Sequence, residues 1–116
     1  MLKGLRDRLT KSNEDLHAES LQARFEDPTC STIAAAGPRG PVRLHGEVAA
    51  LQVVPRAGAP SLEVTVDDGT GRAVAVFTGR RRIGGLDPGR AVLVEGVARR
   101  ERGRLVLVNP AYTLRR

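Results

Sequence analysis

Arginines gather at two places in this chain, and their spacing indicates binding of an anion. Three consecutive arginines occupy positions 80–82, and four of the six residues in 99–104 are arginine. A guanidinium group stays charged at any physiological pH and forms paired hydrogen bonds with phosphate or carboxylate oxygens. Phosphate binding is therefore the first chemistry that the sequence suggests, and nucleic acid is the first ligand to consider.

The charge is distributed unevenly along the chain. From residue 37 onward there are 14 arginines, no lysine and 7 acidic residues, or about +7, whereas residues 1–36 carry 5 basic and 6 acidic residues. An excess of arginine over lysine also arises from codon bias in GC-rich genomes, but such bias does not require a net positive charge. The asymmetry favours an anionic partner for the C-terminal part of the chain.

The sequence lacks the usual motifs of catalysis and of metal or cofactor binding. No Cys and His residues stand at the spacing of zinc ligands, and neither a phosphate-binding loop nor a Gly-x-Ser-x-Gly motif occurs. Asp67 and Asp68 are adjacent carboxylates, but they belong to a glycine-rich turn and have an evident structural role there. We therefore expect a non-catalytic protein without a cofactor or a metal ion.

The cysteine content and the N-terminal residues indicate the cellular compartment of the protein. Cys30 is the single cysteine, so no intrachain disulfide can form, and no apolar run approaches the ~20 residues that a membrane helix needs. Residues 1–17 are charged throughout and lack the apolar stretch of a secretory signal. These features predict a cytoplasmic protein.

Residues 61–78 (SLEVTVDDGTGRAVAVFT) have the alternation of two β-strands joined by a tight turn. The apolar residues of the first strand share one face: Leu62, Val64 and Val66. In the second strand we expect Val74 and Val76 to face the core. The opposite face would then be open and lined by small residues with one aromatic at its end: Ala73, Ala75 and Phe77.

Three further strands are predicted, at 42–54, 91–98 and 104–108. The apolar phase changes along the first of them, so this strand requires a bulge or a sharp bend near Gly46. Five short strands with a long, bent first strand predict an all-β core, namely a five-stranded OB-fold barrel. The connector 79–90 is rich in glycine and proline and is a poor helix, so we expect a helical arm to cover the apolar end of the barrel.

Three segments are predicted along the chain: an N-terminal helical arm at 1–30, a Gly/Pro connector at 31–41 and the barrel at 42–116. Within the arm, Leu2, Leu5 and Leu9 share one helical face. Ser12 with Asp15 has the spacing of a helix start, so two short helices fit the arm as well as one does.

Four segments carry the most distinctive motifs of the barrel: VRLHGEV, LEVTVDDGTGRAVAVF, LDPGRAVLVEGVA and RLVLVNPAYTL. Together they resemble OB-fold nucleic-acid-binding domains, and they are most similar to tRNA-anticodon-type OB domains and to the wedge domain of branch-migrating DNA helicases. The whole chain resembles the small stand-alone OB-fold proteins of actinobacteria. The resemblance implies an OB-fold that binds nucleic acid, although the chain has only 2 Phe and 1 Tyr as aromatic residues.

OB-folds bind ligands on strands two and three, between the loop joining strands one and two and the loop joining strands four and five. Mapped onto this sequence, that surface holds these candidates for contacts with single-stranded DNA or RNA: Arg56, Arg72, Phe77, Thr78, Arg80, Arg81, Arg82, Arg99, Arg100, Arg102 and Arg104. With Phe77 as the one stacking platform, binding is expected to be largely electrostatic, salt-sensitive and weakly selective for sequence.

Each candidate has a structural alternative. Phe77 could be a core residue at a strand end, residues 80–82 could be a solvated run that prevents strand pairing, and Tyr112 fits a cap on the barrel edge better than a ligand contact. For the whole protein, the alternative is a protein–protein interaction or oligomerisation module in which the arm recruits a partner or a second copy. A third hypothesis is that the acidic residues of the arm fold over the basic face and restrain binding.

Overall fold

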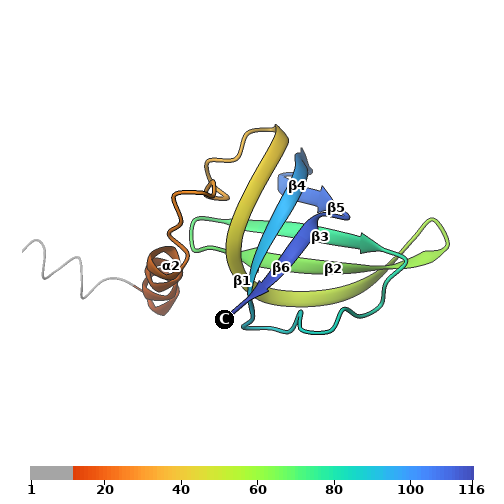
Figure 1. Cartoon of the computed structure of the whole chain (residues 1–116), viewed down its shortest axis with the longest axis horizontal. Helices are drawn as coiled ribbons and strands as arrows, with labels where there is room; N and C mark the ends of the chain where they lie inside the picture. The colour runs from red at the N-terminus through yellow and green to blue at the C-terminus, as the bar shows by residue number, and fades with distance from the viewer. Residues whose placement is uncertain (1–11) are drawn as a thin grey trace, which may run out of the picture.

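The computed structural model describes residues 12–116, in which one helix stands beside a sheet that curls into a closed barrel (Figure 1). The elements in chain order are α2 (Asn13–Arg24), β1 (Arg39–Arg56), β2 (Ala59–Asp67), β3 (Arg72–Thr78), β4 (Ala91–Glu101), β5 (Arg104–Val108) and β6 (Ala111–Arg115). The sheet order is β1-β2-β3-β5-β4, and β4 also pairs with β1 and so closes the ring. Among the strands of residues 12–116, only β3 and β5 pair in parallel. This is the OB-fold topology, which confirms the predicted fold class.

A sixth strand extends the sheet beyond the five that were predicted. β6 pairs antiparallel with the first half of β4, at Ala91–Glu95, next to the part of β4 that pairs with β5. Asn109, with φ of 50°, and Pro110 separate β5 from β6. The Asn109 amide donates to the Val76 carbonyl at 2.7 Å, so the break itself is attached to β3.

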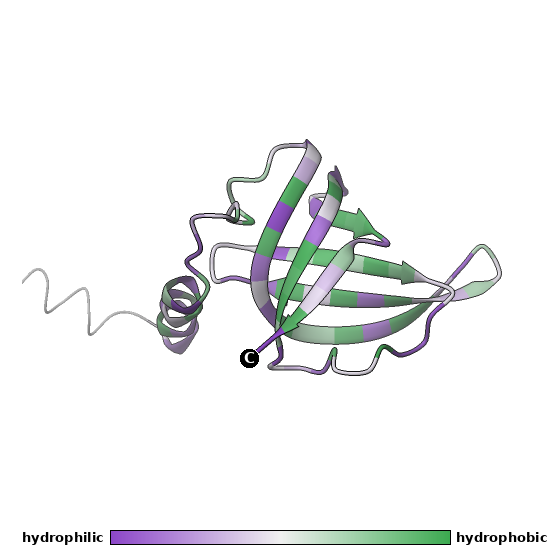
Figure 2. Ribbon diagram, viewed as in Figure 1, coloured by the Kyte–Doolittle hydropathy of each residue, from purple (hydrophilic) through white to green (hydrophobic). Residues whose placement is uncertain are grey.

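The bend predicted for the first strand is present in β1. Its first half pairs with β4 and its second half with β2, with a register shift between Val48 and Ala50. Gly46 is needed because the curl brings its backbone against β2: a Cβ at this position would lie 2.7 Å from Val66 Cγ1 and 2.9 Å from the Asp67 carbonyl oxygen. Figure 2 shows the alternating hydropathy that runs along this curved strand.

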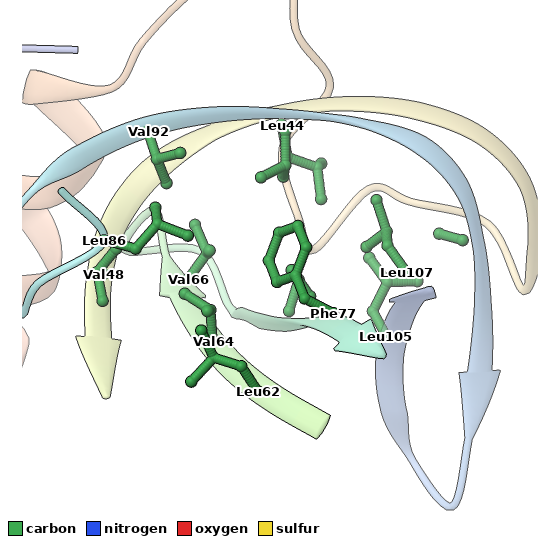
Figure 3. Close-up of a cluster of buried hydrophobic side chains, with 14 of the residues drawn as sticks. Leu44, Val48, Leu62, Val64, Val66, Phe77, Leu86, Val92, Leu105 and Leu107 are labelled. Atoms are coloured by element: carbon green, nitrogen blue, oxygen red, sulfur yellow. The ribbon is translucent and has the colours of Figure 1, made fainter. Parts of the chain in front are cut away.

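The core corrects the predicted orientation of β3. Asp67 pairs with Arg72, so a four-residue turn separates β2 from β3 and places Phe77 opposite Leu62. Directly paired residues point to the same side of a sheet. Phe77 therefore lies inside the barrel, where Figure 3 shows its ring among Leu44, Leu105 and Leu107, and Ala73 and Ala75 are also in the core. The predicted open face of small residues was wrong, because β3 is apolar on both faces and its alternation alone does not tell which face is buried.

The valines of β3 face outward instead. Val74 and Val76 form a separate cluster with Val106 of β5 on the outside of the barrel wall. All three are nearly inaccessible to solvent, at 6%, 0% and 1% exposure. Their direct partners on the neighbouring strands include Glu63, which pairs with Val76, and Arg99, which pairs with Val106.

The connector 79–90 covers the end of the barrel although it is not a helix. Its Ile83 and Leu86 are buried in the main core, together with Ile33 from the segment before β1. The helix does not serve as this cover: Leu21 and Phe25 form their own cluster with Ala91 on the outside of β4. The expectation that the helical arm covers the barrel end was therefore wrong for the described residues.

Helix α2 begins where Ser12 and Asp15 predicted a start. The Ser12 hydroxyl accepts from the Asp15 amide at 3.1 Å, and the Asp15 carboxylate accepts from the Ser12 amide at 3.4 Å, which completes a capping box. The expected leucine face at positions 2, 5 and 9 lies outside the described residues. Within residues 12–116, no helix is long and apolar enough to span a membrane.

Candidate nucleic-acid interface

The outer face is the name used here for the outward side chains of β2, β3, β5 and the last part of β4, together with the start of β1. Two tight hairpins flank it. The β1–β2 hairpin turns at Ala57 and Gly58, with φ of 49° and 79°, and the β4–β5 hairpin turns at Arg102 and Gly103, with φ of 51° and 80°. Positive φ at both central residues is the type I′ geometry, which matches the twist of the flanking strands. The outer face is thus bounded by two short turns instead of long loops.

One buried carboxylate joins the two sides of the outer face. The Glu63 side chain of β2 is only 10% exposed, and its carboxylate lies 3.3 Å from Arg56 Nη2 and 3.7 Å from Arg104 Nη1. Because β3 lies between β2 and β5, the pair of Glu63 with Arg104 crosses the outer surface of β3. Glu63 stands opposite Val76 and helps to cover it.

Other arginines around the outer face bind carboxylates at its margin. Arg72 Nε lies 3.1 Å from Asp67 Oδ2, and Arg99 Nη2 lies 2.7 Å from Glu101 Oε1. The arginines that are paired in this way stay accessible, since their side chains are 37–67% exposed. Within residues 12–116, Arg102 has no carboxylate partner.

A shallow groove of about 460 Å³ runs along one side of the outer face. It lies between the start of β1 and the ends of β4 and β5, and its lining consists of Arg39, Val97, Arg99, Val106 and Val108. Val97 is 68% exposed and Val108 is 45% exposed, which is unusual for valines in a barrel wall. The groove therefore offers accessible aliphatic surface directly beside two guanidinium groups.

Arg39 was missed by the sequence analysis, which assigned it to the connector before the barrel. In the structure it begins β1 and pairs with Arg99 of β4, which lies 60 residues later. No local pattern around Arg39 signals this pairing. With Arg39 included, the outer face and the two hairpins that flank it hold, within residues 12–116, six arginines against three carboxylates: Arg39, Arg56, Arg72, Arg99, Arg102 and Arg104 against Glu63, Asp67 and Glu101.

Two of the predicted contacts, Phe77 and Arg100, have side chains that point away from the outer face. Phe77 is a core residue, and Tyr112 packs edge-on against it with ring centroids 5.6 Å apart, as the capping alternative for Tyr112 predicts. Arg100 stands opposite the buried Leu105 and donates to the Ala36 carbonyl at 3.3 Å. The stacking role predicted for Phe77 was therefore wrong, and Arg100, although exposed, is directed toward Ala36.

Thr78 lies at the end of β3 and is already engaged. Its amide donates to Asn109 Oδ1 at 3.0 Å, and its hydroxyl accepts from Asn109 Nδ2 at 3.0 Å. These bonds hold the break between β5 and β6 against the end of β3. Thr78 therefore has a structural role that the sequence analysis did not foresee.

The arginines at 80–82 do not join the outer face. They lie in the connector after β3, and Arg81 and Arg82 line a second groove against Leu51 and Val53 on the other side of the β1–β2 hairpin. Within the part of the chain that the structure describes, these three arginines form no ion pair and no side-chain hydrogen bond. Their charge is available to a partner, but at a different surface.

The acidic-glycine turn at residues 67–71 attaches the segment before β1 to the barrel. The buried Asp68 carboxylate accepts from the Ile33 amide at 2.9 Å, from the Thr70 amide at 2.9 Å and from the Thr70 hydroxyl at 2.6 Å. Gln22 of α2 donates to the Gly69 carbonyl at 2.9 Å. The two carboxylates of this turn are thus structural, as expected.

Helix α2 lies at the end of β2 and β3 opposite to the β1–β2 hairpin (Figure 1). Besides Gln22, it is attached through Arg24, whose Nη1 lies 3.1 Å from Glu47 Oε1. Residues 13–24 therefore do not cover the outer face. The hypothesis that the arm folds over the basic surface finds no support in this part of the chain.

His45 of β1 lies where the residues that follow α2 pack against the barrel. Its ring packs edge-on against Phe25 at 4.9 Å, and its Nδ1 lies 3.8 Å from Asp27 Oδ2. Burial lowers the pKa of His45, and the positive charges of Arg115 and Arg24 lower it further, against the opposing effect of Asp27. Hydrogen bonds from the Thr29 hydroxyl and amide lower the pKa of Asp27 to about 2.

The lowered pKa of His45 predicts that the fold loses stability in mild acid. The unfolded state binds a proton near pH 6.5 whereas the folded state resists it, so the stabilisation is complete above about pH 6.5 and declines as the pH falls toward the folded-state pKa. We expect a lower free energy of unfolding at about pH 5.5 than at about pH 7.5, measured by urea titration. The His45→Gln variant should show a smaller difference between the two values, and an unchanged difference would contradict the assignment to His45.

No family model and no curated protein matches this sequence. Among solved structures, the chain is similar to a chain in the structure of a Replication Protein A heterotrimer bound to ssDNA. The two are 16% identical, with a TM-score of 0.48, and the match covers 83% of this chain and 75% of that chain. A similarity at this level shows neither the ligands nor the partners of this chain.

Within residues 12–116, no group of three or more His, Cys, Asp or Glu residues is placed to hold a metal ion.

Proposed function

We propose that this protein is a non-catalytic OB-fold module of the cytoplasm that binds single-stranded nucleic acid on its outer face, as an accessory factor. The observation that carries the proposal is the balance of six arginines against three carboxylates around one continuous strand surface. The resemblance of the strand and turn motifs to OB-fold nucleic-acid-binding domains supports the same assignment.

The paired arginines remain available to phosphate. An exposed arginine–carboxylate pair contributes only ~0–1 kcal/mol, so a phosphate can replace the carboxylate at little cost. The carboxylates of Asp67 and Glu101 then hold the guanidinium groups of Arg72 and Arg99 in place before the ligand arrives. Each phosphate that is neutralised releases a condensed counterion, which makes the affinity depend on salt.

The side chains on the outer face explain why selectivity for nucleotide sequence should be low. Valines line the surface, and its described part contains no aromatic side chain on which a base could stack. Contacts with bases are then limited to aliphatic packing in the groove beside Val97 and Val108. Affinity should come mainly from the phosphate backbone, which is the same for every sequence.

The proposal is tested by fluorescence anisotropy with labelled oligothymidylate and oligouridylate of about 20 nucleotides. We expect binding that weakens between about 50 and about 200 mM NaCl, with a slope of about −0.7 in the log–log plot for each phosphate contact. The double variant Arg39→Gln/Arg102→Asn should bind about 10-fold more weakly and lose about 1 to 2 units of slope. Asparagine at position 102 is chosen because it tolerates the positive φ of the turn.

Arg90→Gln/Arg116→Gln is the matched control, because it removes the same charge. Arg90 precedes the first residue of β4, at the far end of that strand from Arg99, and Arg116 follows β6. This control should bind nearly as the wild type does. Equal weakening in both double variants, or affinity that does not change with salt, would contradict the proposed interface.

A protein-interaction module remains the second candidate function. One observation favours it, namely an apolar groove at the unpaired arginines of the connector, on the side of the β1–β2 hairpin away from the outer face. The lining of that groove shares no residue with the groove of the outer face.

A further inference from the structure

We infer that the groove between the β1–β2 hairpin and the connector 79–90 binds a segment of a partner protein that carries a bulky apolar side chain next to acidic residues. The groove measures about 250 Å³. Its lining is Leu51, Gln52, Val53, Leu62, Arg81, Arg82, Ile83, Leu86 and Asp87. This site is independent of the proposed nucleic-acid interface.

The floor of the groove is formed by the side of the β1–β2 hairpin that faces the connector. Val53 pairs with Leu62, and both point toward the side on which the connector lies. Leu62, Ile83 and Leu86 are buried in the main core, whereas Val53 is still 46% exposed. The connector therefore covers the inner side of the hairpin incompletely and leaves aliphatic surface in contact with solvent.

The rim of the groove carries charge that residues 12–116 do not neutralise. Neither Arg81 nor Arg82 forms an ion pair or a side-chain hydrogen bond within residues 12–116. The arginines of the outer face behave differently, since most of them are paired with a carboxylate. Two free guanidinium groups beside exposed aliphatic surface are complementary to a peptide that combines carboxylates with an apolar anchor.

Two features of this groove favour a peptide as its occupant. The volume lies below the ~300–1,000 Å³ of typical small-molecule sites and suits one or two protein side chains. Asp87 lines the same groove and repels a continuous chain of phosphates, whereas a peptide can place a lysine or a hydroxyl residue against it.

The positions of the charges predict the orientation of the peptide. Its acidic residues should face Arg81 and Arg82, its apolar anchor should rest on the exposed Val53, and its far end should avoid acidic residues near Asp87. A peptide with acidic residues on both sides of the anchor should therefore bind more weakly than one with acidic residues on a single side.

The test begins with a phage library of random dodecapeptides that is selected on the immobilised full-length protein. Individual enriched peptides are then synthesised with a fluorescent label and titrated by anisotropy. We expect them to combine a large apolar residue with acidic residues. Val53→Asp and Arg81→Ser/Arg82→Ser should each weaken their binding at least ~10-fold, since an apolar anchor or its charge partners are removed. Both substitutions lie at accessible positions, and amide spectra and thermal unfolding verify that the variants are folded.

Val97→Asp is the matched control. It places the same charge at an exposed valine, 68% accessible, in the groove of the outer face. This control should retain the peptides and lose affinity for oligothymidylate, whereas Val53→Asp should lose the peptides and retain oligothymidylate. Peptides that bind Val53→Asp as well as the wild type, or a selection that enriches no peptide, would overturn the inference. Loss of oligothymidylate binding in Val53→Asp would overturn it too, because nucleic acid would then be the occupant.

Discussion

Replacing Asp68 by alanine is expected to lower the free energy of unfolding by about 3 kcal/mol, or roughly 100-fold in the folding equilibrium. The Asp68 carboxylate is buried, at 5% exposure, and accepts three hydrogen bonds. Alanine would leave the Ile33 amide and the two donors of Thr70 without their acceptor. Because Ile33 belongs to the main core, we expect the loss to spread into the barrel.

Asp67→Ala is the matched comparison, since it removes a neighbouring carboxylate from the same turn. Asp67 accepts from the Gly69 amide at 2.8 Å and pairs with the exposed Arg72. Its removal should cost only about 1 kcal/mol. Urea titration gives both values, and an effect of Asp68→Ala no larger than that of Asp67→Ala would show that the buried carboxylate does not anchor residues 31–34.

The second large effect is expected for Gly69→Ala, which should release helix α2 from the barrel. A Cβ at this position would overlap the Ala18 carbonyl oxygen and would lie 2.7 Å from the Gln22 amide nitrogen. Both atoms belong to the helix backbone, so no side-chain rotation relieves the overlap. Gly69 also has φ of 87°, a conformation that alanine adopts only with strain of ~1–2 kcal/mol.

Gly58→Ala separates the two contributions. Gly58 has φ of 79°, and a Cβ there would meet no atom within 4 Å, so this variant measures the backbone strain alone. We expect Gly69→Ala to lose about 2 kcal/mol more than Gly58→Ala and to expose the amides of α2 to hydrogen exchange. Protected α2 amides in Gly69→Ala would show that the helix does not need this close approach.

Much of the fold follows from local signals in the sequence. Three such signals are present as predicted: the alternation in β2, the acidic-glycine turn and the capping pair of Ser12 with Asp15. Each signal is made by residues that are only a few positions apart in the sequence. The orientation of β3 did not follow, because Val74 and Val76 are as apolar as the residues on its inner face. Only the register with β2 decides which side is buried.

The positive charge of the candidate site could be predicted from the sequence, but the arrangement of its residues could not. The arginines of the two hairpins were identified from their position between strands, and the structure places Arg56 and Arg104 on either side of Glu63. Arg39 was assigned to the connector because its position depends on pairing with Arg99, and the direction of the Arg100 side chain depends on Ala36, 64 positions earlier. Long-range pairing of this kind leaves no trace in a local sequence pattern.

The two type I′ hairpins suggest how this scaffold can acquire new ligands. Gly58 and Gly103 occupy the tips of the hairpins, and a Cβ on either would meet no atom within 4 Å. Loop closure becomes only slowly more costly as a loop grows, so extra residues at these tips should leave the core undisturbed. The acidic-glycine turn cannot be lengthened in this way, because Asp68 and Gly69 hold the segment before β1 and helix α2. Engineered recognition loops therefore belong at the hairpin tips, where the barrel tolerates insertion and the outer face lies within reach.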